Sequence, residues 1–180
     1  MAELAQKTYA NALFSVATEN NLEEQMLNEL LSLREIFSSN TEYIKLMNSP
    51  IVVHDKKIAL LQEAFGETIC IYNLNLLQVL VDNLRFNLVC QIIDEYKNLY
   101  NEKHNIVAVT AITATDLSDI LKEKLKTKIE KLTNKTVNMN FLIDEKILGG
   151  IKIEINNTQI DGSVLSNLNS LKEAIKLTTL

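Results

Sequence analysis

Histidine, cysteine, glycine and proline are all scarce in this chain of 180 residues, and tryptophan is absent. The two cysteines, Cys70 and Cys90, both lie in apolar runs, which argues against a disulfide framework and favours buried thiols in a reduced compartment. The two histidines are His54 and His104, and no pair of Cys or His residues has the spacing of metal ligands. We therefore expect neither a metal site nor a cofactor.

The few glycines also fail to form a phosphate-binding motif. The sequence contains neither G-x-G-x-x-G nor G-x-x-x-x-G-K-[ST], the spacings of a dinucleotide site and a P-loop. Ser163 could act as a nucleophile only beside a base, and both histidines fall in the helical half of the chain. No catalytic residue is predicted.

A structural interpretation suits the glycine-containing stretch "LGGIKIEINNTQIDGSVLSNLNSLKEAI". Gly149 and Gly150 open an alternating strand, where glycine permits a bulge or a close backbone approach. Asp161, Gly162 and Ser163 then stand where a strand must turn into a helix, with Asp161 or Ser163 as the helix cap. These five residues are predicted to form a structural motif without chemistry.

Positive charge and long apolar runs are also lacking. The net charge of −5 and the pI near 5.1 argue against binding of a polyanion such as a nucleic acid. No stretch of about 18 uncharged apolar residues occurs, and the start "MAELAQKTYANALF" has no signal-peptide pattern. We expect a soluble protein that faces the cytoplasm, without direct insertion into a membrane.

The first half of the chain has apolar residues at spacings of three and four, which predicts a helical bundle. Pro50 and polar or glycine breaks separate the segments. Six helices are expected, at about residues 4–19, 22–37, 41–47, 54–65, 67–84 and 87–103.

After Asn105 the apolar period changes to two. "IVAVTAITA", "VNMNF" and "GIKIEIN" read as half-buried strands, and a helix over "DLSDILKEKLKTKIEKL" is expected to be capped by Thr115 or Asp116. Asn156-Asn157 suits the turn of a hairpin, and a last helix follows Ser163. The sequence thus predicts a two-domain α+β protein, with a six-helix bundle in residues 1–105 and a small α/β domain with a short mixed sheet and two helices in residues 106–180.

The net charge of the chain also changes at the boundary after Asn105. Residues 1–105 hold eight Lys and Arg against fourteen Asp and Glu, a net charge of −6, whereas residues 106–180 hold ten against nine, a net charge of +1. Two separate units are favoured.

Two of the expected helices are apolar nearly all round. Eleven of the sixteen residues from Ile69 to Leu84 are apolar or Tyr, and the segment from Leu4 to Ala17 has two apolar stripes. Either these helices are central and covered by their neighbours, or they lie side by side and leave an apolar groove for an amphipathic helix of a partner.

Four stretches together resemble the delta subunit of bacterial and chloroplast rotary ATP synthases, whose mitochondrial counterpart is the oligomycin-sensitivity-conferring protein. They are "YANALFSVA", "SPIVVHDKKIALLQEAFG", "NLLQVLVDNLRFNLVCQIIDEYKNLYNEKHN" and "IDEKILGGIKIEINNTQIDGSVLSNLNSLKEAI". The resemblance covers almost the whole chain, and its most specific part is the last block. Where the family often has Gly after the sixth helix, this chain has His104-Asn105, and Asn also tolerates a left-handed backbone.

The resemblance implies a non-catalytic stator subunit of the proton-translocating ATP synthase, on the cytoplasmic side of a bacterial membrane. The N-terminal domain would bind the alpha subunits of the catalytic head, and the C-terminal domain the paired b subunits of the peripheral stalk. In the family the first and fifth helices form a groove that receives an N-terminal helix of an alpha subunit. By position, the groove residues would be Tyr9, Ala12, Leu13, Val16, Leu76, Val79 and Asn83. Two alternatives remain, an enzyme with a helical regulatory domain and a free-standing helix-binding adaptor.

Overall fold

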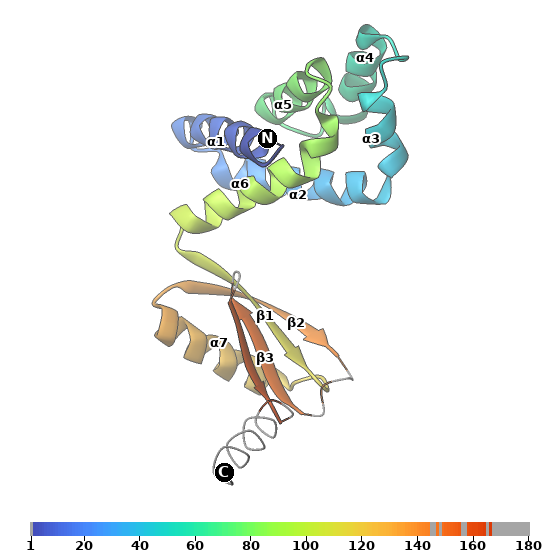
Figure 1. Ribbon diagram of the computed structural model, residues 1–180. Coiled ribbons are helices and arrows are strands. Elements are labelled where there is room, and N and C mark those ends of the chain that lie inside the picture. Colours follow the sequence, from blue (N-terminus) through green and yellow to red (C-terminus); the bar gives the residue numbers. More distant parts are fainter. Residues whose placement is uncertain (1, 145–146, 148, 156–157, 165, 167–180) are drawn as a thin grey trace, which may run out of the picture. The chain divides into compact units, whose positions relative to one another are not determined.

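The computed structural model describes residues 2–144, 147, 149–155, 158–164 and 166 (Figure 1). Backbone contacts divide the chain into two compact units, residues 1–100 and 101–180. Seven α-helices and a four-stranded mixed sheet occur in the described part, so the α+β class is confirmed.

The first unit is built from helices alone. Its elements are α1 (Ala2–Asn20), α2 (Glu23–Ser39), α3 (Thr41–Asn48), α4 (His54–Phe65), α5 (Ile71–Asp82), a 3₁₀ turn η1 (Phe86–Leu88) and α6 (Val89–Lys103). Most of these bounds lie within two residues of the expected ones. The exception is α5, which begins four residues later than predicted because the chain after Gly66 forms a turn in which Thr68 and Ile69 both donate to the Phe65 carbonyl.

Aromatic side chains join α2, α3, α4 and η1 in the core of this unit. The Phe37 ring lies 5.7 Å from Phe65 and 5.4 Å from Phe86 in edge-to-face contacts, and it stacks on Tyr43 at 5.9 Å. At the surface, Arg34 Nε on α2 lies 2.7 Å from Asp94 Oδ1 on α6. Through these contacts α3, α4, η1 and α6 pack against α2.

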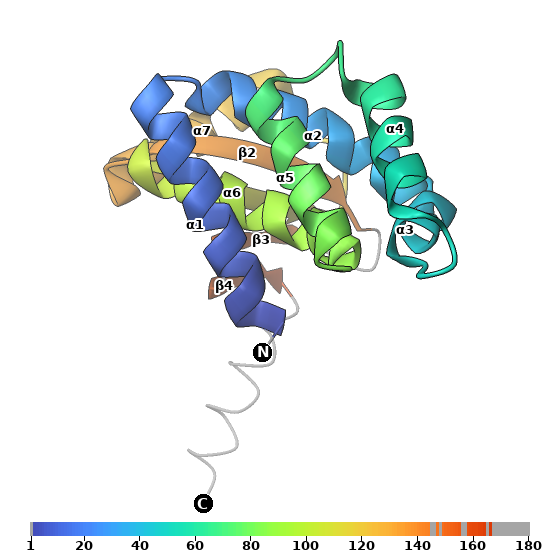
Figure 2. The ribbon, with the colours of Figure 1, turned by 90° about the horizontal axis from the view of Figure 1, so that it is seen from above.

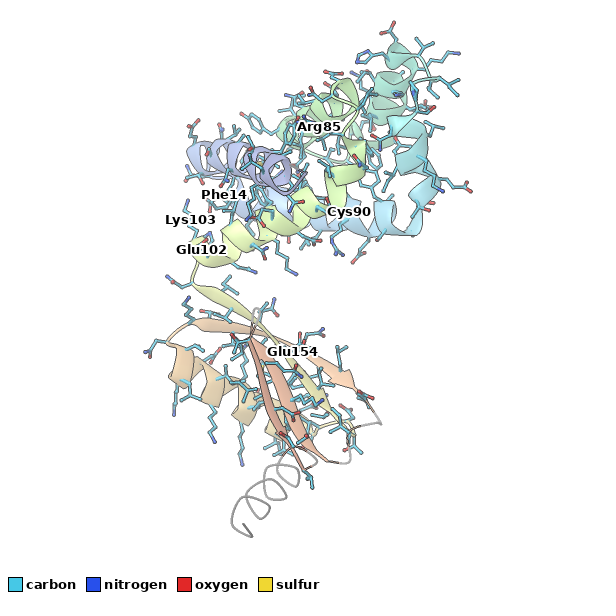
Figure 3. All side chains as sticks on the ribbon, in the orientation of Figure 1. Phe14, Arg85, Cys90, Glu102, Lys103 and Glu154 are labelled. Carbon is cyan, nitrogen blue, oxygen red and sulfur yellow. The ribbon has the colours of Figure 1, made fainter. Side chains whose placement is uncertain are left out.

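The two stripes of α1 have different neighbours. Ala10 and Ala17 are fully buried in the helical core. Phe14, labelled on α1 in Figure 3, makes an edge-to-face contact with Tyr96 of α6 at 5.4 Å between ring centroids. The other stripe faces α5. Figure 2 shows α1 and α5 side by side, as their contacts require.

The second unit consists of β1 (Ile106–Thr113), α7 (Asp119–Thr133), β2 (Thr136–Ile143), β3 (Gly150–Ile155) and β4 (Thr158–Ser163). The strand order is β2-β1-β3-β4, with β1 and β2 parallel and the other pairs antiparallel. Helix α7 lies along one face of the sheet (Figure 1). On that face Ile129 packs with Val107, Val109 and Val137.

Three predicted details of this unit have different outcomes. The hairpin is confirmed, since Ile155 pairs with Thr158, although its turn residues Asn156-Asn157 lie outside the described residues, as does most of the last helix. The left-handed backbone at Asn105 is confirmed by its φ of 53°. The predicted cap of α7 is wrong: the helix begins at Asp119 with Ser118 in the cap position, and Asp116 forms an ion pair with Lys122 at 3.0 Å.

Candidate functional site

A groove lies between α1 and α5, and it brings together six of the seven predicted groove residues. Its volume is about 300 Å³. The lining consists of Tyr9, Ala12, Leu13 and Val16 from α1 and Tyr72, Asn75, Leu76 and Val79 from α5. Tyr72 and Asn75 were missed, although each lies four residues before a predicted member of the same helix face, Leu76 and Val79.

The groove has an apolar floor and polar ends. Leu13 and Leu76 form the floor, each only 7% exposed, whereas Val79 is 42% exposed. At one end Arg85 Nη1 donates to Tyr9 Oη at 3.4 Å, and at the other Tyr72 Oη donates to Asn20 Oδ1 at 3.3 Å. Because the end of α1 at Asn20 thus meets the start of α5 at Tyr72, the two helices run antiparallel.

Asn83 is not among the residues that line the groove. It is the C-cap of α5, and its Nδ2 donates to the Val79 carbonyl at 2.8 Å. The Val79 carbonyl thus accepts two bonds, one from this side chain and one from the Asn83 backbone N–H at 3.1 Å.

The apolar excess of α5 now has its explanation. One side of the helix is buried in the core, through Leu74, Leu77, Leu80 and Val81, while Leu76 and Val79 belong to the groove. The helix is therefore covered by its neighbours on one side and lines a groove on the other, and binding of a partner helix in that groove stays a prediction.

An ion pair holds the end of α5 to the start of α4. His54 Nε2 lies 2.6 Å from Asp82 Oδ1, and the hydrogen bond to Asp82 raises the pKa of His54, with Asp55 adding to the effect. The pair is exposed, so its contribution to the stability of the fold is modest.

The predicted structural motif lies where the start of β3, with Gly149 and Gly150, meets the end of β4, with Asp161, Gly162 and Ser163. Gly150 has a φ of 88°, and a Cβ there would stand 2.5 Å from the Gly162 carbonyl oxygen. Ser163 is only 3% exposed, and its Oγ accepts the Ser166 N–H at 3.2 Å, which is the geometry of an N-cap. The Ser163 N–H donates to Asp161 Oδ1 at 2.8 Å, and the pKa of Asp161 is lowered by its hydrogen bonds to Ser163.

We expect the change Gly150→Ala to lower the stability of the second unit by roughly 1 to 3 kcal/mol, since Ala at positive φ is strained and its Cβ would collide with the backbone of β4. Gly162→Ala is the matched control, because a Cβ there meets the Ile151 carbonyl at 3.0 Å without a positive φ. Hydrogen exchange of the β3 and β4 amides in urea measures both effects. Equal losses in the two variants would contradict the close-approach explanation.

Three further properties of the described residues concern metal binding, the cysteines and membrane spans. In that part of the chain no group of three or more His, Cys, Asp or Glu side chains could hold a metal ion. Cys70 and Cys90 are free and partly buried, and burial raises the pKa of both thiols. None of the helices in the same residues is long and apolar enough to cross a membrane.

Comparison with known protein families gives a match over residues 5–175 to the family described as ATP synthase delta (OSCP) subunit. The chain belongs to this family. The ATP synthase subunit delta of Chlorobium phaeobacteroides (strain DSM 266) is 32% identical over 96% of this chain and 95% of its own length. That of Acetivibrio thermocellus is 33% identical over 96% of this chain and 98% of its own length.

A solved structure has the same fold. A chain of the Toxoplasma gondii mitochondrial ATP synthase hexamer superposes with a TM-score of 0.75 over 94% of this chain and 96% of its own, at 21% identity. Delta (OSCP) subunits are structural and coupling components of the ATP synthase. The expectation of a non-catalytic stator subunit is therefore confirmed, and the interpretation as an enzyme with a regulatory domain is wrong.

Proposed function

We propose that this delta-family chain joins the alpha subunits at the top of the catalytic head to the b subunits of the peripheral stalk. In this proposal the six helices of residues 1–105 form the domain that binds the head, and residues 106–180 form the domain that holds the stalk. The complex would lie on the cytoplasmic side of a bacterial cell membrane and translocate protons.

The groove between α1 and α5 is the observation that carries the proposal. An amphipathic helix binds by laying an apolar face, with residues spaced three and four apart, into a complementary apolar groove. The floor of Leu13 and Leu76 offers such a surface, and the hydroxyl groups of Tyr9 and Tyr72 at the two ends suit the polar flanks of a helix. The α5 wall from Tyr72 to Val79 spans about 10 Å, which matches two turns of a bound helix.

The division into two units supports the second half of the proposal. A stator joint must bind two partners at once and resist the torque of the rotating shaft. Two compact units on one continuous chain, residues 1–100 and 101–180, suit such a joint, and the net charge differs between residues 1–105 at −6 and residues 106–180 at +1.

A pull-down distinguishes this function from that of a free-standing helix-binding adaptor. We expect a tagged copy of the full chain, expressed in its native source, to recover the alpha and b subunits together from detergent-solubilised membranes. An adaptor would instead recover other helical proteins from the soluble fraction. Recovery of the tagged chain from membranes without either subunit would refute the proposal.

A further inference from the structure

Helix α5 begins without a cap of its own. Its N-cap residue is Cys70, whose side chain makes no capping hydrogen bond, and its first turn has no acidic residue. The first N–H groups of a helix have no partners within that helix, so a helix start inside a protein needs acceptors from elsewhere.

The side chain of Glu29, on α2, supplies the acceptor. Its Oε2 accepts the Cys70 backbone N–H at 2.7 Å and Asn73 Nδ2 at 2.8 Å, and its Oε1 accepts Gln25 Nε2 at 3.0 Å. In a capping box, a carboxylate in the first turn of a helix bonds the N–H of that helix's own N-cap residue. Here the same bond comes from another helix, 41 residues away in the chain.

Asn73 fixes the geometry of this contact. Its side chain is fully buried, and its Nδ2 also donates to the Met26 carbonyl of α2 at 3.3 Å. Its neighbour Tyr72 and the next turn, with Asn75 and Leu76, line the groove. A rotation or shift of α5 about this contact would therefore displace the α5 wall of the groove relative to α1.

We infer that Glu29 is a positioning residue for partner binding: it caps α5 from α2 and so sets the register of the α5 wall against α1. The inference rests on the proposed function of the groove. The other end of α5 is tied to α4 by His54 and Asp82, so Glu29 determines the end that carries Tyr72.

Electrostatics favour an ionised Glu29 in this place. Burial opposes its charge, but hydrogen bonds from Cys70, Gln25 and Asn73 outweigh that effect and lower the pKa of Glu29. The positive end of the α5 dipole acts in the same direction. The titratable group beside it is the Cys70 thiol, whose pKa is raised by burial and by Glu29, so that the thiol stays neutral.

The pH dependence has a definite sign. The pKa of Glu29 is lower in the folded protein than in the unfolded chain. Its contribution to the stability of the folded protein is therefore complete above the ordinary pKa of a glutamate and is lost as the pH falls through the lowered value. The difference in the free energy of unfolding between wild type and Glu29→Gln should therefore be constant near neutral pH and shrink below about pH 4.

The test compares full-length Glu29→Gln with Glu35→Gln, which removes the same charge from an exposed position on α2. Two quantities are measured at pH 7.5, the hydrogen exchange of the first-turn amides of α5 and the affinity for a synthetic peptide of the alpha-subunit N-terminus. We expect Glu29→Gln to speed the exchange about tenfold, as for loss of one charge-assisted hydrogen bond, and to lower the affinity for the peptide severalfold. Glu35→Gln should change neither.

A rescue variant separates positioning from general loss of stability. In the double variant Glu29→Gln with Gln25→Glu, the side-chain oxygen of the new amide at position 29 can accept from Cys70 and Asn73 while its Nε2 donates to the carboxylate at position 25, so both exchange and affinity should recover towards wild type. If Glu29→Gln alone does not fold, the same two measurements on the double variant test the inference.

Three results would overturn the inference, and they are distinguishable. Unchanged exchange in Glu29→Gln would show that the cap is unimportant. Faster exchange with unchanged affinity would show that Glu29 only stabilises the helix start. Failure of the wild-type chain to bind the peptide would refute the groove function itself, and the inference with it.

Discussion

The change Val79→Asp should weaken binding of the alpha-subunit N-terminal peptide at least tenfold and leave the helical circular dichroism unchanged. Val79 is 42% exposed at the rim of the groove, so in the free protein the new carboxylate stays in contact with water and the fold tolerates it. In the complex the same carboxylate would be covered by an apolar helix without a partner. Truncation of an interface anchor typically costs about 1 to 3 kcal/mol, and burial of an unpaired charge costs more.

Leu46→Asp is a matched control for this prediction. Leu46, on α3, is 40% exposed and is not among the residues that line the groove, so the variant adds the same charge at the same exposure elsewhere in the helical unit. We expect Leu46→Asp to bind the peptide as the wild type does, measured by isothermal titration calorimetry. A folded Val79→Asp variant with unaltered affinity would remove the binding site from this groove.

Deletion of residues 106–180 should uncouple the ATP synthase and not inactivate it. The helical unit would still bind the catalytic head, so ATP hydrolysis by the head should survive. Proton pumping should fail, because a stator broken at its upper joint lets the head turn with the rotating shaft. The expected signature in reconstituted membranes is hydrolysis at the level of the full chain, with pumping reduced to that of membranes without the chain.

The compactness of each unit is the reason to expect that the truncated chain folds. The helical unit has its own core, centred on Phe37, Phe86 and Tyr96, and the sheet unit has another, around Val109 and Ile129. Circular dichroism of the truncated chain is the control for this experiment. If the truncated chain restored proton pumping as well as the full chain, the second unit would not hold the stalk.

Local sequence patterns predicted most helices and strands because each has a clear apolar period. The two stripes of α1 and the apolar excess of α5 also indicated a groove, since one core face cannot cover so much apolar surface. Tyr72 and Asn75 could have been added by continuing the α5 face one turn towards the N-terminus.

The start of α5 could not be predicted in this way. Its cap comes from Glu29, so the signal lies outside the local window that a periodicity analysis reads. A contact between distant elements thus fixes a helix start that local preference leaves open. The wrong cap of α7 is a different case, because Asp116 and Ser118 are both favourable cap residues within the same few positions.

The most direct test of the account asks whether the two units must be one chain. Stripped membranes are reconstituted with the full chain, or with residues 1–105 and 106–180 added as separate polypeptides at equal amounts, and ATP-driven proton pumping is measured. The account predicts that the full chain restores pumping and that the mixture does not. In the mixture residues 1–105 bind the head and residues 106–180 bind the stalk, but no chain connects the two. Equal pumping with the mixture would contradict the claim that this chain is the mechanical joint between them.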